Sequence, residues 1–377
     1  MTSDVARADL AVDTGTGPAQ QPYNLAWYGA DLTTGGIIEE LAGVTLTQPL
    51  GLKVGAATTS AVSLNLAGAP RGWQEATTPG RCMLVAVDTV TDTPLWAGSI
   101  LPTTGGSAST LDISLATLEA YFDRRFPGDV AMVQQDQAVI ATAVMGNLFV
   151  DGPCFVLDAP PTGVLADYAV ADSDDKSILS CMQELMGQGG PEFTVDVEWA
   201  PGHTGFVLPI RVRPSIGVQT DQPEGTFDFP GSVTDYTLTH TYEAGQGATV
   251  VVARGEGEGA ARLTSAVHVA ADLIAAGWPR YVYRYTPASG VTSVDQLDAH
   301  AAAALAMMRL GGQAWTVQAT ASRAPRIGAD WRLGDSVRLA VETSPRHPDG
   351  TDVVARAWAW QLDPGADTIT PILIEEG

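Results

Sequence analysis

Residues 174–199, DDKSILSCMQELMGQGGPEFTVDVEW, join a short amphipathic helix to the strand that follows it. Asp174 and Asp175 stand where a helix dipole favours negative charge, and Gly187 is a typical helix stop. The apolar residues with helical spacing are Ile178, Leu179, Cys181, Met182, Leu185 and Met186. The segment is therefore predicted to have a structural role as a helix followed by a strand. It carries no catalytic signature.

The composition indicates a β-rich globular protein. The chain has 377 residues, of which 45% are hydrophobic and 17% charged, with 40 glycines and 24 prolines. So many turn-forming residues predict short strands separated by turns. The length predicts two to four domains, each with its own core.

The charge is strongly acidic, with 20 Lys and Arg against 43 Asp and Glu and a net charge of −23. This balance argues against a surface that binds nucleic-acid phosphates. Acidic residues could instead line a conduit and keep a passing polyanion from adhering. Simple solubility is the alternative explanation of the charge.

We expect a soluble chain that is made in the cytoplasm. No window resembles an 18-residue apolar span, and the first residues lack the charged-then-apolar plan of a signal peptide. The three cysteines, Cys82, Cys154 and Cys181, are far apart and have apolar neighbours. They are predicted to be buried free thiols.

Alternating apolar residues predict strands through most of the chain, as at Val62, Leu64 and Leu66. The fold class is predicted as mainly β with α+β insertions. The first β-barrel or sandwich is expected to contain strands at residues 23–28, 37–46, 61–66, 82–90 and 95–101. Later strands are expected at residues 193–199, 206–212, 233–242, 248–254, 315–321, 336–341, 353–362 and 369–374.

Three further helical segments are predicted outside residues 174–186. Residues 115–126, LATLEAYFDRRF, and residues 136–146, DQAVIATAVMG, are expected to be helical, the second capped by Asp136 and ended by Gly146. Residues 293–310 have a capping-box pattern in Ser293 and Gln296.

These elements predict five units along the chain. They are an N-terminal arm (1–22), a first β-barrel domain (23–115), an α+β domain (116–214), a second β-barrel domain (215–260 and 313–377) and an inserted domain (261–312) with the helix 293–310.

No motif of an enzyme, cofactor site or metal site is present, and no catalytic, cofactor-binding or metal-ligating residue is assigned. The five histidines, His203, His240, His268, His300 and His347, are far apart in sequence. We therefore expect a protein that is not an enzyme and takes no cofactor.

Four features imitate sites, and each has a simpler structural explanation. Residues 255–259, GEGEG, follow a strand but lack dinucleotide-loop spacing. A helix-capping role is a simpler explanation than Ca²⁺ binding for the cluster of Asp172, Asp174 and Asp175. His240 suits cross-strand packing. Trp358 and Trp360 share a predicted strand face and suit a core or an interface better than a glycan site.

Five segments in order carry a resemblance over residues 25–377. They are LEAYFDRR (118–125), DQAVIATAVM (136–145), DSDDKSILSCMQELMGQGGPEFTVDVEW (172–199), GATVVVARGEGEG (247–259) and WRLGDSV (331–337). Their order and spacing resemble the baseplate hub, or tail-tip minor tail protein, of long-tailed, siphovirus-like phages that infect actinobacteria. The family is similar to the hub proteins of contractile tails.

The resemblance implies a virion protein at the tail tip. It implies a homotrimer whose six tube-like β-barrels form a pseudo-six-fold ring. The implied partners are the distal tail protein, the tape-measure protein and other tail-tip or receptor-binding proteins. DNA would pass through the lumen during ejection without specific binding, and no membrane segment or cofactor is implied.

Three alternatives remain open from the sequence. A receptor-binding adhesin would present an exposed aromatic platform to host cell-wall glycan. A tail-associated hydrolase would show converging carboxylates or a metal cage. The hub of a phage-derived injection device or gene-transfer particle would have the same mechanical role, so the sequence does not separate it from a phage hub.

Overall fold

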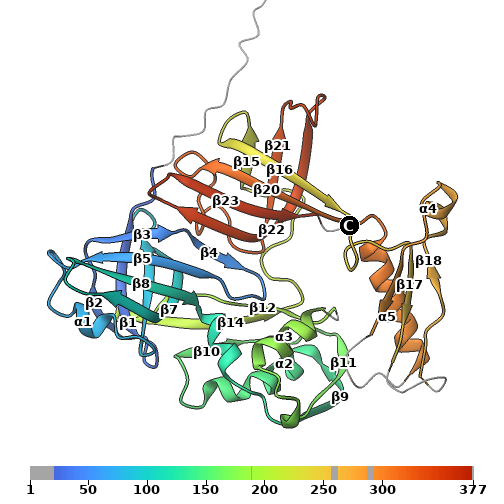
Figure 1. Cartoon of the computed structure of the whole chain (residues 1–377), viewed down its shortest axis with the longest axis horizontal. Coiled ribbons are helices and arrows are strands. Elements are labelled where there is room, and N and C mark those ends of the chain that lie inside the picture. Colours follow the sequence, from blue (N-terminus) through green and yellow to red (C-terminus); the bar gives the residue numbers. More distant parts are fainter. Residues whose placement is uncertain (1–20, 188, 256–261, 287–292, 376–377) are drawn as a thin grey trace, which may run out of the picture.

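Strands dominate the architecture, which confirms the predicted mainly β character (Figure 1). The computed structural model describes residues 21–187, 189–255, 262–286 and 293–375. Most of the predicted N-terminal arm and residues 256–259 of the glycine-rich loop lie outside the described residues.

The first large sheet has seven strands in the order β2-β1-β6-β7-β8-β5-β3, all antiparallel to their neighbours. A short helix, α1 (Trp73–Ala76), precedes β6. The strands are β1 (Leu25–Asp31), β2 (Ile37–Glu40), β3 (Val44–Gln48), β5 (Thr59–Asn65), β6 (Cys82–Asp88), β7 (Thr93–Gly105) and β8 (Thr110–Thr117).

The middle part of the chain mixes helices with two small sheets. One sheet has the order β10-β14-β12, with β13 also on β14, and β9 pairs with β11 in the other. The strands are β9 (Val130–Asp136), β10 (Phe155–Asp158), β11 (Leu165–Val170), β12 (Glu192–Val195), β13 (Glu198–Trp199) and β14 (Phe206–Arg213). The α-helices are α2 (Gln137–Met145) and α3 (Ile178–Gly187), and the 3-10 helices are η1 (Leu118–Arg124), η2 (Gly146–Phe149), η3 (Asp172–Asp174) and η4 (Pro201–His203).

The second large sheet has the order β15-β21-β22-β23-β20-β16 and receives a seventh strand, β4 (Leu50–Lys53), beside β22. Its own strands are β15 (Thr226–Phe229), β16 (Val233–Thr241), β20 (Gly312–Thr320), β21 (Ser336–Val341), β22 (Thr351–Asp363) and β23 (Thr368–Ile374).

The two large sheets repeat one strand order. Without β2 and β4, each has six strands, and counting these along the chain gives the order 1-4-5-6-3-2 in both sheets. One pairing differs, because β1 is antiparallel to β6 whereas β15 is parallel to β21. The chain therefore contains the same arrangement twice.

A smaller unit interrupts the second large sheet between β16 and β20, and Figure 1 shows it at the right-hand end of the molecule. Its sheet has the order β18-β17-β19, and α5 packs on β17. Its elements are β17 (Val250–Ala253), β18 (His268–Val269), α4 (Ala271–Ala275), β19 (Val282–Tyr285) and α5 (Val294–Met308). We call these elements the inserted unit.

Strand β6 explains how the parts share their cores. Every residue of β6 is buried, because its two faces pack in different clusters. Cys82, Leu84 and Ala86 face the core that fills the space between the two large sheets. Met83 and Val85 face the core that contains α2, α3 and β14.

Several local predictions need correction. Asp174 and Asp175 do not begin the helix, because α3 starts at Ile178 and the Ser177 hydroxyl accepts from the Ser180 N–H at 3.2 Å. Ser293 precedes α5 but makes no side-chain cap, so the predicted capping box is absent. Residues 115–126 were expected to be helical, but residues 115–117 belong to β8 and only residues 118–124 form a helix, of the 3-10 type.

One strand pairing bears on a predicted domain boundary. Residues 215–260 were assigned to the second barrel, yet β17 pairs with β18 and β19 of the inserted unit. A short strand with apolar residues on both faces does not reveal its sheet. The division into four domains otherwise stays a prediction.

Candidate functional site: the junction of the two large sheets

Strand β4 joins the two halves of the chain. It leaves the first large sheet between β3 and β5 and pairs antiparallel with β22, with Leu50 opposite Leu362 and Leu52 opposite Trp360. The indole Nε1 of Trp96 in β7 donates to the Gly51 carbonyl at 3.0 Å, inside the shared core. Backbone pairing and burial therefore fix the two sheets to each other.

A buried ion pair crosses the same junction. Arg326, which follows β20, donates to both carboxylate oxygens of Asp88 in β6, at 2.6 and 2.8 Å, and the two side chains are 6% and 0% exposed. The guanidinium also lies 4.1 Å from the ring centroid of Tyr23, and it donates to the Gln21 carbonyl at 2.6 Å. A charge that is desolvated in this way stays stable only while its partner is present.

The next contact adds a hydrogen bond to this cluster. The Tyr23 hydroxyl accepts from the Ile327 N–H at 2.8 Å, and burial raises the pKa of Tyr23. The phenol is thus neutral and acts as a fixed polar contact.

A second buried ion pair ties β22 to the middle of the chain. Arg356 donates through Nη1 to Glu192 Oε1 at 2.8 Å and through Nη2 to Oε2 of the same carboxylate. The Arg356 side chain is 3% exposed, and it also donates to the carbonyls of Ile216 and Gly334 at 2.8 and 3.1 Å. The pair orients β12 against the second sheet.

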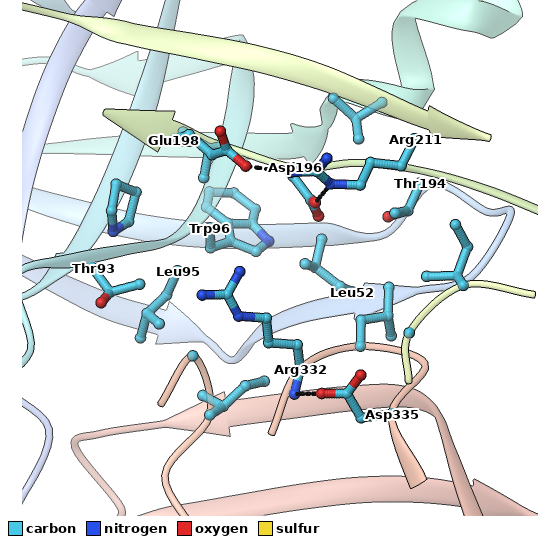
Figure 2. A pocket seen from close by; sticks show the side chains of 18 of the residues that line it. Leu52, Thr93, Leu95, Trp96, Thr194, Asp196, Glu198, Arg211, Arg332 and Asp335 are labelled. Atoms are coloured by element: carbon cyan, nitrogen blue, oxygen red, sulfur yellow. Dashed lines mark hydrogen bonds and ion pairs between the residues drawn. The ribbon is translucent and has the colours of Figure 1, made fainter. Parts of the chain in front are cut away.

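A pocket of about 610 Å³ opens where these parts meet (Figure 2). Leu52, Leu95 and Trp96 line it beside the charged residues of β13 and β14. Arg332 points toward Trp96 in Figure 2, and its backbone N–H donates to Asp335 Oδ2 at 2.8 Å. The walls come from the first sheet, the middle part and the second sheet.

Two carboxylates that line this pocket, Asp196 and Glu198, are engaged by Arg211, which also reaches Asp158 outside the lining. Arg211 donates to Asp196 Oδ2 at 2.5 Å, to Asp158 Oδ2 at 2.6 Å and to Glu198. Arg213 shares Asp158, and this sharing helps to hold the pKa of Asp158 below its usual value. Charge-assisted hydrogen bonds that tie three carboxylates to one arginine suit a rigid junction.

Of the sequence candidates, Trp358 and Trp360 lie at this junction, and the other described ones lie elsewhere. Trp360 is 2% exposed in the core between the sheets, and Arg356 lies 5.3 Å from the ring centroid of half-buried Trp358. His240 Nε2 lies 2.9 Å from the Leu310 carbonyl, which links β16 to the end of α5. Neither tryptophan forms an exposed platform.

The aspartates near η3 serve the backbone. Asp174 accepts from the Ala171 N–H at 3.0 Å, and Asp129 accepts from the Asp172 N–H at 2.8 Å. Among the described residues, no three of the His, Cys, Asp and Glu side chains lie together as a metal site would require. The three cysteines are free thiols, with Cys82 and Cys181 buried as predicted and Cys154 half-buried.

Sequence reasoning missed the residues that form the junction. Asp88 and Arg326, and likewise Glu192 and Arg356, are separated by long stretches of chain and belong to no motif. The available signal was weak: each arginine lies among apolar residues, where an unpaired charge is costly. No described helix has both the length and the apolar character to cross a membrane.

Solved structures that align with this chain include tail proteins and a chain of the Francisella PdpA-VgrG complex. The tail protein from Neisseria meningitidis MC58 aligns with a TM-score of 0.59 at 14% identity, over 94% of this chain and 98% of that chain. The prophage tail protein gp18 from Listeria monocytogenes EGD-e aligns with a TM-score of 0.54 at 10% identity, over 94% of each chain. A chain of the Francisella PdpA-VgrG complex aligns with a TM-score of 0.54 at 8% identity, over 96% of this chain and 54% of that chain.

No protein-family model matches the sequence, and no curated protein matches it either. At identities this low, the structural likeness establishes the fold. The chain therefore has the fold of phage tail proteins, and its role is argued below.

Proposed function

We propose that this chain is a structural virion protein, the hub at the tip of a long phage tail. Three copies form a ring in which the two large sheets of each chain act as two tube-like β-barrels. The ring joins a six-fold distal tail protein ring to a three-fold tip and surrounds the path of the ejected DNA. The tape-measure protein and other tail-tip proteins are its further partners, and an actinobacterial host is part of the proposal.

The repeated strand order is the observation that carries this proposal. A chain with two like sheets presents two like units, so three chains supply six units around one axis. The junction made by β4, Asp88–Arg326 and Arg356–Glu192 fixes the two units of one chain relative to each other. A three-fold ring can match a six-fold ring only if the two units of each chain keep a fixed spacing.

The acidic charge suits a channel lining. With a net charge of −23, the chain has more carboxylates than its internal ion pairs use, and we propose that they concentrate on the lumen. DNA would then slide past without adhering. A neutral or positive electrostatic potential along the lumen of the assembled ring would contradict this part of the proposal.

The first test is the mass of the purified chain in solution. Sedimentation and native mass spectrometry should give a species of three times the 39.3 kDa chain mass. An image of the intact particle complements this measurement, because it counts the copies in the presence of the neighbouring tail proteins. A monomer in solution, together with a particle that lacks three copies at the tail tip, would reject the hub.

A phage-derived injection or gene-transfer particle is the second candidate. It is favoured by the alignment with a chain of the Francisella PdpA-VgrG complex, which covers 96% of this chain. The mechanical role would be the same, but the surrounding particle would differ. Purifying the particle with this chain and testing it for a packaged phage genome separates the two.

A further inference from the structure

Strands β7 and β22 occupy the same position in the two repeats. Each has 13 residues, and each is fifth of six along the chain in its sheet. Each also has an irregularity in its pairing with the next strand, between Ile100 and Thr103 in β7 and between Ala357 and Ala359 in β22. The residues after the irregularity therefore form the same end of the strand in the two sheets.

The two strands differ in what covers this last part. In β22, pairing with β21 stops at Arg356, and residues 359–362 pair with β4 on the same side. In β7, pairing with β6 reaches Ser99, and residues 103–105 pair with β8 on one side only within the described chain. Leu101, beside this edge, is 41% exposed. We call residues 103–105 the open edge of β7.

The repeat also indicates which segment belongs at the open edge. β4 comes from the connection between β3 and β5. The equivalent connection in the second sheet runs from β16 to β20, and the inserted unit fills it. The inserted unit thus stands at the chain position that β4 has in the first repeat.

The inserted unit has a strand edge of its own to offer. Within the described residues, β19 pairs with β17 and with no other strand. Tyr281 and Val282 at its start are 47% and 58% exposed. An uncovered strand edge with apolar side chains is a site for pairing with another chain.

The two surfaces lie at opposite sides of the molecule. Figure 1 shows the inserted unit at the right and β3, β5 and β8 of the first sheet at the left, so one chain does not bring them together. Two different surfaces at opposite ends make a head-to-tail contact, which closes into a ring when the rotation fits.

We propose that β19 of one copy pairs with the open edge of β7 in the next copy, in the way that β4 pairs with β22 inside each chain. This inference rests on the proposed trimer and names its contact. The occupant of the open edge is a second copy of this chain. The ring then has two kinds of junction, one within each chain and one between neighbouring chains. Both are made by the addition of a strand to the edge of a sheet.

The test compares trimer formation in three variants by sedimentation equilibrium of the full chain. Leu101→Asp and Val282→Asp each place a charge in the proposed contact, and each should weaken the trimer by at least about tenfold in dissociation constant. Leu165→Asp is the matched control, because Leu165 is 60% exposed on β11, outside the contact. It should leave the dissociation constant unchanged.

A second measurement covers variants that fold poorly. With a mild oxidant such as oxygen and a copper catalyst to take up the two electrons, the double variant Thr104→Cys, Val282→Cys should form a disulfide product that links two or three chains. Neither single variant should form it. A wild-type trimer that both Asp variants keep, with no linked product, would overturn the inference and leave the proposed function standing. Absence of any wild-type trimer, in solution and in the particle, would instead reject the proposed function.

Discussion

Asp88 and Arg326 are the residues on which the junction depends most. Asp88→Asn should lower the free energy of unfolding by about 3–5 kcal/mol, because it leaves the Arg326 charge buried without its counter-ion. Asp352→Asn is the control, since Asp352 and its partner Arg338 are both about half exposed. Urea unfolding of both variants measures the difference, and equal losses would contradict the argument.

A second residue-scale prediction concerns pH. Glu119 is fully buried, and burial raises its pKa from 4.5 to about 7, although Oε1 accepts from the Val195 N–H at 2.9 Å. Between these two pH values the unfolded chain has released the proton and the folded chain has kept it. Stability therefore falls as pH rises through this window and levels off above pH 7, by roughly 3 kcal/mol for this group.

Glu119→Gln removes this titration and keeps a side-chain acceptor for Val195. The variant should gain stability relative to the wild type between pH 5 and pH 8, by about 3 kcal/mol in the difference of unfolding free energies. Chemical denaturation at the two pH values measures it. A difference that does not change with pH would show that the carboxyl titrates normally.

At the scale of the element, β4 depends on a glycine. A Cβ on Gly51 would lie 2.9 Å from the Trp360 carbonyl oxygen, so Gly51→Ala should push β4 from β22 and cost about 1–3 kcal/mol. Gly68→Ala is the matched control, because nothing lies within 4 Å of its added Cβ. Thermal unfolding of both variants tests this, and equal midpoints would mean that the strand pair adapts.

Elements differ in how well the sequence predicts them. The alternation of apolar and polar residues located β5 and β21 correctly. Asp136 caps α2 as predicted, because its side chain accepts from the Ala138 N–H at 2.8 Å. β4 escaped prediction because Leu50–Lys53 is too short for a periodic signal and its partner is near the other end of the chain. Ser293 has the residue type of a cap but not its hydrogen bond.

For the whole molecule, composition and strand patterns were enough for the mainly β class. The repeat of one strand order was not visible, because equivalent strands such as β7 and β22 share length and position but not residue pattern. The junction was equally hidden, since Asp88–Arg326 and Arg356–Glu192 form only when both sheets are in place. Contacts between distant segments leave little trace in a single sequence.

Strand β4 also has a consequence for biosynthesis. β4 leaves the ribosome long before β22 is synthesised. The backbone N–H and C=O groups that pair with β22 are therefore without that partner while most of the chain is translated. An unpaired strand can pair wrongly with another nascent chain on the same mRNA. Its length of four residues and its terminal Lys53 limit that hazard, which explains why so central a connection is made by so short a segment.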